Sequence, residues 1–318
     1  MRAVRFHEHG GPDVLTVEDI EEPEPGHGEV VVEAGAVGVN PVDTYFREGA
    51  YPVPDLPFVP GSDFAGTVVS VGEGVEEFAF GDRVFGTGLG NGRSGTYAEQ
   101  VVAPVEMLAH LPEDVALADA AALALVGTTA WQALVHHADV EPGETVLIHG
   151  GSGGVGHVAI QLAETMGARV VATASPDHHE TLEELGADAV FDYRRDDLER
   201  VISEAGAPDV ILDTHMDRYL QLNANVAADG ARIVGVGNDT AEGGFDDIGV
   251  TKSKELRYQF MSMFNTRDQS AVLARLADLL LRGDVAPVLH ETYSLENADE
   301  AQRSVLHDSF VGKLVLSP

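Results

Sequence analysis

A glycine-rich segment at residues 150–156, Gly-Gly-Ser-Gly-Gly-Val-Gly, contains the residues with the clearest chemical use. It follows the apolar run Thr145–Ile148, and after it apolar side chains recur at the spacing of a helix. Glycines spaced GxGxxG between a strand and a helix permit a tight turn and bring backbone N–H groups close to a pyrophosphate. The segment therefore predicts a dinucleotide site, and a turn with a purely structural role is the alternative. The predicted contacts are Gly151, Ser152, Gly153, Gly154, Val155 and Gly156.

The residues after the next apolar run indicate which dinucleotide this site prefers. NAD-specific sites place an acidic residue about 20 positions downstream, at the end of the second strand, where it holds the ribose 2′-hydroxyl. Here the run ends at Ser175, and no carboxylate follows before Asp177. The gap leaves room for a 2′-phosphate, to which Ser175 can donate a hydrogen bond. We expect NADPH rather than NADH, with positive charge from His178, Arg194 or Arg195, unless His178 is only a solvated residue at a helix start.

Two kinds of element must position this site. Up to about residue 115, short β-like runs between glycines and prolines predict a barrel-like β region, with strands at Glu29–Glu33, Thr67–Val71, Asp82–Phe85 and Tyr97–Val102. After an Ala/Leu-rich helical stretch, uninterrupted Val, Ile and Leu runs indicate a parallel sheet that is covered by helices on both faces. These strands are expected at Thr145–Ile148, Arg169–Ala172, Ala189–Phe191, Asp209–Leu212 and Arg232–Val236. A helix at Ala271–Leu281 and a strand at Lys313–Leu316 complete an α/β fold, a doubly wound Rossmann sheet plus a β-barrel domain.

The composition excludes several kinds of chemistry. The chain has 318 residues, 44% hydrophobic and 23% charged, which are ordinary values for a globular protein of about two domains. It contains no cysteine, so disulfides, iron–sulfur clusters, thiolate zinc sites and a cysteine nucleophile are excluded. The N-terminus lacks an apolar segment with a cleavage site, and no run of about 18 apolar residues occurs. We therefore expect a cytoplasmic protein with no membrane partner.

The charge balance is extreme. The chain has 53 acidic and 19 basic residues, a net charge of −34, and only three of the basic residues are lysines, at 252, 254 and 313. The acidic residues are scattered over every segment, as on a surface that stays hydrated in concentrated salt, where self-repulsion is screened. The sequence thus indicates an extreme halophile as the source. The same balance argues against a nucleic-acid partner, because phosphates are repelled and no basic stripe exists.

Seven segments occur in a characteristic order along the chain: GVNPVDTYFREGAYP (38–52), PGSDFAGTVVSVGEGV (60–75), GDRVFG (81–86), GTTAWQAL (127–134), VLIHGGSGGVG (146–156), LGADAVFDY (185–193) and GKLVL (312–316). Together they resemble the zinc-independent quinone oxidoreductases, the zeta-crystallin-like branch of the medium-chain dehydrogenase/reductase superfamily. The resemblance implies a GroES-like catalytic domain at residues 1–118 and 265–318, around a Rossmann domain at residues 119–264. It also implies a homodimer or a homotetramer.

The resemblance implies further cofactor contacts. The matching positions in this sequence are Asn40, Thr128, Ser175, Tyr193, Gly237, Phe264, Asn265 and Lys313. In the family, Asn40 and Thr128 correspond to residues beside the nicotinamide. The sequence departs from the family pattern at two places. His178 stands where many relatives have lysine, which weakens the expectation of NADPH, and Thr214-His215-Met216 replaces a turn of smaller residues.

The resemblance also bears on metal binding. Asn40 and Ser62 stand where zinc-dependent relatives have a cysteine and a histidine ligand, and Ala124 is near the third ligand position. A catalytic zinc needs about three N, S or O ligands, so we expect no metal. Adjacent histidines such as His136 and His137 are poor substitutes, because they point in different directions along a helix.

These residues favour hydride transfer from NADPH to a quinone or an activated C=C bond, because no zinc is expected to polarise an alcohol. Asn40, Tyr45 and Tyr51 are the polar residues expected around the electrophile. A quinone reductase is the first hypothesis. A reductase of 2-enoyl thioesters or enones is the second, because those relatives use a tyrosine at about the place of Tyr51 as proton donor. A protein that binds NADPH or RNA without turnover is the third.

Overall fold

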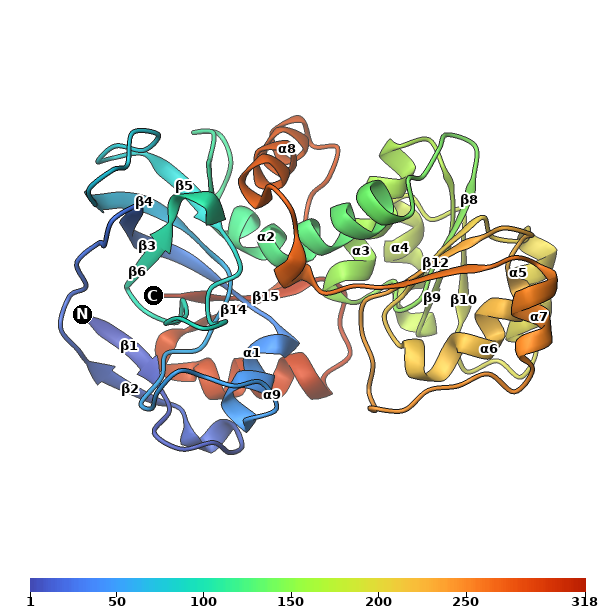
Figure 1. Cartoon of the computed structure of the whole chain (residues 1–318), viewed down its shortest axis with the longest axis horizontal. Coiled ribbons are helices and arrows are strands. Elements are labelled where there is room, and N and C mark those ends of the chain that lie inside the picture. Colours follow the sequence, from blue (N-terminus) through green and yellow to red (C-terminus); the bar gives the residue numbers. More distant parts are fainter. The chain divides into compact units, whose positions relative to one another are not determined.

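The computed structural model describes all 318 residues, which form two compact units (Figure 1). Unit 1 comprises Met1–Thr128, Arg267–Ser309 and Lys313–Pro318, and unit 2 comprises Thr129–Thr266 and Phe310–Gly312. The domain limits given above, after residues 118 and 264, stay a prediction beside this division.

Unit 1 is built on β-strands from both ends of the chain. Its larger sheet has the order β14-β15-β3-β4-β5-β7, with β6 also paired to β3, and β1 pairs with β2 in a separate ladder. The strands are β1 (Arg2–Arg5), β2 (Thr16–Asp19), β3 (Glu29–Val39), β4 (Phe64–Val71), β5 (Arg83–Gly86), β6 (Gln100–Pro104), β7 (Leu108–His110), β14 (Leu289–Ser294) and β15 (Lys313–Ser317). The helices are α1 (Pro41–Glu48), α2 (Leu117–Trp131), which ends in unit 2, α8 (Gln269–Arg282) and α9 (Ala298–His307).

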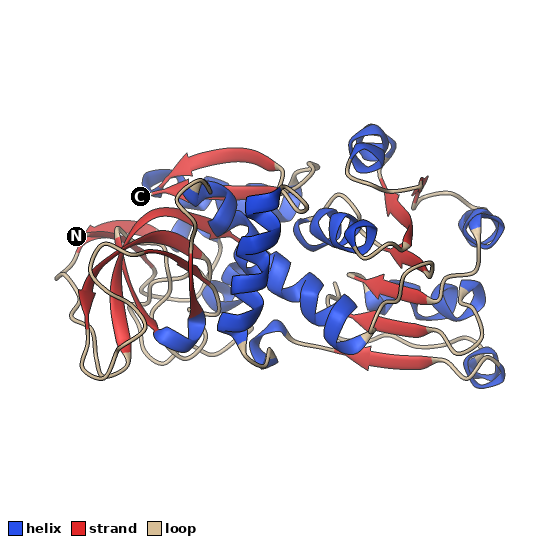
Figure 2. Cartoon of the chain, turned by 90° about the horizontal axis from the view of Figure 1, so that it is seen from above, coloured by secondary structure: helices blue, strands red, loops and turns tan.

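Unit 2 contains a six-stranded parallel sheet of order β10-β9-β8-β11-β12-β13. Its strands are β8 (Thr145–Ile148), β9 (Arg169–Ala174), β10 (Ala189–Asp192), β11 (Val210–Asp213), β12 (Arg232–Gly235) and β13 (Arg257–Phe260). Its helices are α3 (Gly154–Thr165), α4 (His179–Glu184), α5 (Leu198–Ala205), α6 (Met216–Val226) and α7 (Ile248–Ser253), and Figure 2 shows helices alongside these strands. This order is that of a doubly wound Rossmann sheet, so the predicted α/β fold is confirmed.

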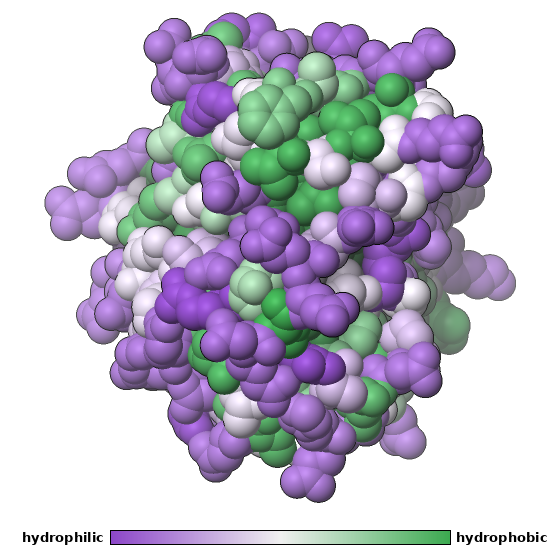
Figure 3. Space-filling view, turned by 90° about the vertical axis from the view of Figure 1, so that its left-hand side faces the viewer, coloured by the Kyte–Doolittle hydropathy of each residue, from purple (hydrophilic) through white to green (hydrophobic).

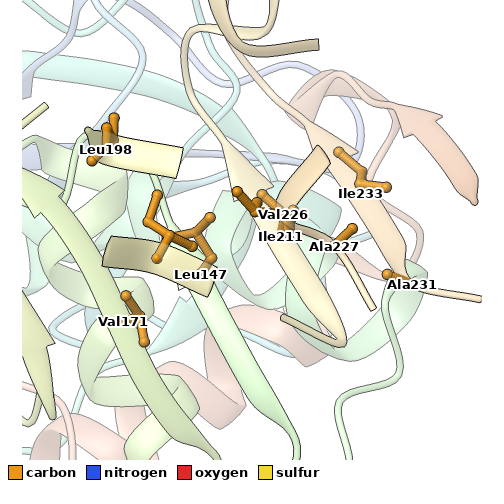
Figure 4. Packing of buried hydrophobic residues seen from close by; sticks show 9 residues of the cluster. Leu147, Val171, Leu198, Ile211, Val226, Ala227, Ala231 and Ile233 are labelled. Atoms are coloured by element: carbon orange, nitrogen blue, oxygen red, sulfur yellow. The ribbon is translucent and has the colours of Figure 1, made fainter. Parts of the chain in front are cut away.

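The hydrophobic core of unit 2 includes residues from four of these strands. Leu147, Val171, Ile211 and Ile233 come from four neighbouring strands and pack together in one buried cluster (Figure 4). Residues of α5, of the end of α6 and of the segment after α6 cover this layer, among them Leu198, Ile202, Val226, Ala227 and Ala231. Strands that are buried on both faces require continuous apolar residues, which is the pattern that identified them in the sequence.

The long apolar helical stretch Leu117–His137 is a core element. By length and composition it is the one stretch that could cross a membrane, with a mean hydropathy of 1.3, but 72% of its apolar window is buried inside the structure. Residues 120–124 are completely buried. Its apolar residues are therefore explained by packing.

Figure 3 shows one face of the molecule, on which hydrophilic side chains surround smaller hydrophobic areas.

Candidate functional site

The glycine-rich turn connects β8 to α3 in unit 2. Gly150 has a φ of +69°, and a Cβ at Gly156 would lie 2.1 Å from the Gly150 oxygen, so only glycine permits this turn to close. The Gly151 N–H donates to Thr173 O of β9 at 2.9 Å, and the Gly153 N–H donates to Gly150 O at 3.0 Å. The predicted contacts 151–156 therefore form the end of this turn and the first residues of α3.

The start of α3 fits the pyrophosphate of a dinucleotide. The first N–H groups of a helix have no partner within the helix, and they carry partial positive charge. Gly153 precedes the helix, and Ser152, Gly154 and Val155 are partly exposed. A cradle of small residues before an open helix N-terminus is the arrangement that binds such anions.

Ser175 and Tyr193 lie at equivalent places in neighbouring strands. Ala174 and Asp192 are paired in the β9–β10 ladder, and each of the two predicted residues follows directly. The partly exposed Ser175 side chain forms no hydrogen bond within the chain, and Tyr193 is 41% exposed. The structure thus places Ser175 and Tyr193 directly after two paired strands, β9 and β10. Partly exposed His178 follows in the 3-10 turn Pro176–His178.

Arg194 and Arg195, the predicted sources of positive charge at this place, are already paired with carboxylates. The Arg194 Nε atom donates to Asp192 at 2.9 Å, and its guanidinium lies 5.4 Å from the centre of the Tyr193 ring. The Arg195 Nε atom donates to Asp197 at 2.8 Å. A phosphate at this end of the sheet would therefore compete with acidic neighbours for each guanidinium.

The loops after β11, β12 and β13 contain the other predicted contacts of unit 2. The Gly237 oxygen accepts from the Met216 N–H at 3.0 Å, which ties the loop after β12 to the loop after β11. Phe264 and Asn265 belong to the 3-10 turn Met263–Asn265 after β13, where Phe264 is partly buried and Asn265 is exposed.

A series of buried side-chain hydrogen bonds supports the glycine-rich turn, and it was not predicted from the sequence. The His149 ring contacts the Thr173 hydroxyl at 3.1 Å and the Asn223 Oδ1 atom at 2.9 Å, and Asn223 donates to Asp213 at 2.7 Å. Burial lowers the pKa of His149 to about 4 and raises that of Asp213 to about 6. The neutral imidazole thus fixes the base of the turn. Polar residues at the ends of two apolar strands are the signal that could have identified this series.

In unit 1, the structure brings Asn40 and Lys313 together. Because β15 runs antiparallel to β3 with Leu314 opposite Val39, Lys313 falls opposite Asn40. The Lys313 ammonium donates to Asn40 Oδ1 at 2.5 Å and to Val39 O at 2.6 Å, and the Asn40 amide donates to Asp63 Oδ2 at 2.8 Å. Asn40 and Lys313 are only 1% and 3% exposed. The Asn40 side chain is therefore rigidly oriented, and a cofactor contact by Lys313 stays a prediction.

Two buried carboxyl groups accompany this pair. The Asp63 Oδ2 atom lies 3.9 Å from the Lys313 ammonium, and Asp43 Oδ2 accepts from the Asn40 N–H at 2.9 Å and from the Tyr97 hydroxyl at 3.1 Å. Burial raises the pKa of Asp43 to about 7, raises that of Asp63 and lowers that of Lys313. Sequence reasoning did not identify either carboxyl group as part of a site.

Tyr45 and Tyr51 form an aromatic pair at the end of α1. The Tyr51 N–H donates to Tyr45 O at 3.1 Å, and the two rings meet edge to face with their centres 5.7 Å apart. Tyr51 is 44% exposed, and its hydroxyl forms no hydrogen bond within the chain, whereas Tyr45 is partly buried. Thr128, in α2, is completely buried, and its hydroxyl also lacks a partner. Unpartnered polar groups of this kind suit residues that contact a ligand.

The residues at the family's zinc positions do not fit a zinc ion. The Asn40 amide is occupied on both sides, and the Ser62 hydroxyl donates to Leu89 O at 3.0 Å. The third position is the completely buried Ala124, and the ammonium of Lys313 lies where a cation would meet Asp63. No group of three His, Asp or Glu side chains in the chain is arranged to hold a metal ion.

Comparison with known proteins agrees with this architecture. The alcohol dehydrogenase GroES-like domain family matches residues 26–113, and the zinc-binding dehydrogenase family matches residues 154–278. The chain is 35% identical to the quinone oxidoreductase of Homo sapiens, over 99% of this chain and 97% of that protein.

Solved structures cover the chain completely. A structure described as an NAD-dependent alcohol dehydrogenase superposes with a TM-score of 0.94 at 32% identity, over 100% of both chains. The Escherichia coli quinone oxidoreductase in complex with NADPH gives 0.91 at 28% identity, again over 100% of both chains. The chain therefore belongs to the quinone oxidoreductase-like family of the medium-chain dehydrogenase/reductase superfamily, and it is an oxidoreductase.

Proposed function

We propose that this oxidoreductase reduces quinones with NADPH and without zinc. The observation that carries the proposal is that β9 is followed by the hydroxyl of Ser175 and by no carboxylate before Asp177, with the exposed Tyr193 after the paired strand β10. When bound, the reduced nicotinamide supplies a hydride. The solved E. coli relative, which is described as an NADPH complex, supports the same cofactor. Another solved relative is described as NAD-dependent, so the preference requires a direct test.

Residues of both units can bind and orient the two reactants, the cofactor and the quinone. The turn from Gly151 to Gly156 holds the pyrophosphate, while Ser175 donates to the 2′-phosphate. In unit 1, the edge-to-face ring pair Tyr45–Tyr51 offers aromatic surface with an exposed phenol. A quinone can pack against such a ring, and its carbonyl oxygen becomes anionic on reduction. The phenol of Tyr51 can then donate a hydrogen bond to that oxygen.

The same phenol keeps a second function open, the reduction of 2-enoyl thioesters or enones. That reaction places hydride on one carbon and requires a proton on its neighbour, so a positioned acid contributes about 10²–10⁴-fold to the rate. The exposed hydroxyl of Tyr51, which has no partner in the chain, supports this candidate. Quinone reduction has no such requirement, because water readily protonates the oxygen anion. A protein that only binds NADPH is a weaker candidate, since the turn and the Asn40 network are complete.

A turnover panel of quinones, enones and enoyl thioesters with NADPH in molar KCl tests the proposal. Tyr51→Phe should retain the quinone kcat within about tenfold, because water can replace its proton. The double change Tyr45→Phe/Tyr51→Phe shows whether Tyr45 substitutes as donor, and Tyr293→Phe, at a partly exposed residue of β14 whose hydroxyl donates to Glu291, is the control. A hundredfold loss with Tyr51→Phe, together with faster turnover of enoyl thioesters than of quinones, would instead establish the second function.

We also propose that the enzyme works in the salt-rich cytoplasm of a halophile. The net charge of −34 supports this environment and argues against a nucleic-acid partner. The family resemblance supports a homodimer or homotetramer. Light scattering coupled to size-exclusion chromatography in molar KCl measures the oligomeric state directly.

A further inference from the structure

The loops after β8 and β11 lie at the point where the strand order of the sheet reverses. β8 is flanked by β9 on one side and by β11 on the other, so the chain leaves the two central strands in opposite directions. In open parallel sheets a ligand binds in the crevice outside such a point, with one mononucleotide on each half of the sheet. Ser175 belongs to the β9 half, and the β11 half is left for the second nucleotide.

The loop after β11 contains His215. The Thr214 hydroxyl donates to His149 O at 2.9 Å, which ties the loop to the base of the glycine-rich turn. A Cβ at Gly150 would lie 3.2 Å from the Cε1 atom of His215, so the imidazole borders the turn itself. His215 is partly exposed, and its ring meets Tyr219 edge to face at 6.3 Å.

The hydrogen bonds of Thr214 determine the state of this ring. The single hydroxyl proton of Thr214 is given to His149 O, so the contact at 2.9 Å between Thr214 Oγ1 and His215 Nδ1 requires a proton on Nδ1. In the neutral ring, Nε2 is then an acceptor, and it forms no hydrogen bond within the chain. Asp213 accepts from the His215 N–H at 2.8 Å, and its carboxyl group disfavours an anion nearby.

We propose that His215 is a cofactor-binding residue whose Nε2 atom accepts a hydrogen bond from a ribose hydroxyl of the nicotinamide half of the dinucleotide. A hydroxyl is the donor that fits a bare ring nitrogen beside a carboxyl group, whereas a phosphate offers only acceptors. Thr214 is the positioning residue, since it fixes both the tautomer and the distance of the loop from the turn. The inference rests on the proposed function, because it requires that a dinucleotide occupies the turn.

Three probes separate the parts of the cofactor in calorimetric titrations in molar KCl at pH 8. 2′,5′-ADP lacks the second ribose, 2′-phospho-ADP-ribose contains it without nicotinamide, and NADPH is complete. His215→Phe keeps the ring but removes the acceptor, so it should weaken the last two probes equally, by about two- to tenfold, and leave 2′,5′-ADP unchanged. His215→Gln, whose amide oxygen restores an acceptor, should recover part of the loss. His307→Phe, at the exposed end of α9 in unit 1, is the control.

The outcomes separate this inference from the function on which it rests. Equal weakening of all three probes would mean that His215→Phe distorts the turn or that His215 contacts phosphate, and unchanged binding of all three would mean that it contacts nothing. Either result overturns the proposal while leaving NADPH binding intact. If the unmodified protein binds none of the probes, the proposed function itself fails.

Discussion

Lys313 offers the sharpest test of the reasoning about unit 1, because its ammonium is the charge partner of the buried Asp63 carboxylate. Lys313→Met removes the charge while keeping an unbranched side chain of similar length. Asp63 then remains completely buried and 3.9 Å from an apolar group in place of the ammonium. Removal of one partner of a buried ion pair typically destabilises a protein by about 3–5 kcal/mol.

The geometry gives a value for the coupling itself. Two unit charges 3.9 Å apart interact by about 4 kcal/mol at an effective dielectric constant of about 20. A double-mutant cycle of Lys313→Met and Asp63→Asn isolates this interaction, since asparagine retains an oxygen that can accept from Asn40. We expect the double variant to be more stable than Lys313→Met alone, with a coupling free energy of about 2–4 kcal/mol.

The cycle is measured by calorimetry and by chemical denaturation followed by circular dichroism, in KCl above 1 M and at pH 8. The alkaline pH matters, because protonation of Asp63 would otherwise relieve the loss of its partner. Salt screens a buried pair much less than an exposed one, so the coupling should persist as the KCl concentration rises. The exposed pair Arg200–Glu204 on α5 is the control and should couple far more weakly. If the two single changes at 313 and 63 were additive within about 0.5 kcal/mol, the account of this cluster would be wrong.

Four further outcomes follow from the same structure. Because the folded-state pKa of Asp43, about 7, exceeds its unfolded value, the free energy of unfolding should fall as pH rises from about 4 through 7; Asp43→Asn should remove that part of the slope in pH-dependent denaturation. Ser175→Asp places a carboxylate at the end of β9 and should lower the ratio of kcat/KM for NADPH over NADH at least about tenfold; an unchanged ratio would contradict the proposed phosphate contact. Elemental analysis should find no stoichiometric zinc, and chelators should leave the activity unchanged; zinc that tracks with activity would refute this expectation. The melting temperature should fall steeply as KCl is lowered from about 1 M to about 0.1 M, because the Debye length grows from about 3 to 10 Å around a chain of charge −34; a flat series would contradict it.

The fold was predictable where side-chain burial leaves a pattern. The strand predicted at Thr145–Ile148 is β8, and the strand predicted at Glu29–Glu33 continues as β3 to Val39. By contrast, β13 was not predicted, because it is an edge strand whose residues Arg257–Phe260 are mostly exposed and show no apolar run. The short helix α1 was also missed, since it is set by Asp43 accepting from the Asn40 N–H rather than by an apolar period.

The candidate site was predictable where a motif is local. The glycine-rich turn is contiguous in sequence, so spacing and context were sufficient to locate it. The cluster of Asn40, Asp63 and Lys313 joins residues up to 273 positions apart, through the register of β15 against β3, and no local pattern encodes that register. Sequence spacing likewise gave no sign that His215 would border Gly150, because that proximity depends on the order of the strands.

The few lysines show how surface adaptation and interior geometry act on the same residue type. Of the three lysines in 318 residues, only Lys252 is exposed. Lys254 donates to three carbonyl oxygens at the end of α6, those of residues 224, 225 and 227, at 2.6–3.0 Å. Lys313 donates to two acceptors and faces Asp63. An ammonium offers three donors on a compact head, which a planar guanidinium cannot reproduce where acceptors converge. Two lysines therefore occupy places where arginine would not fit, in a chain whose surface otherwise has almost none.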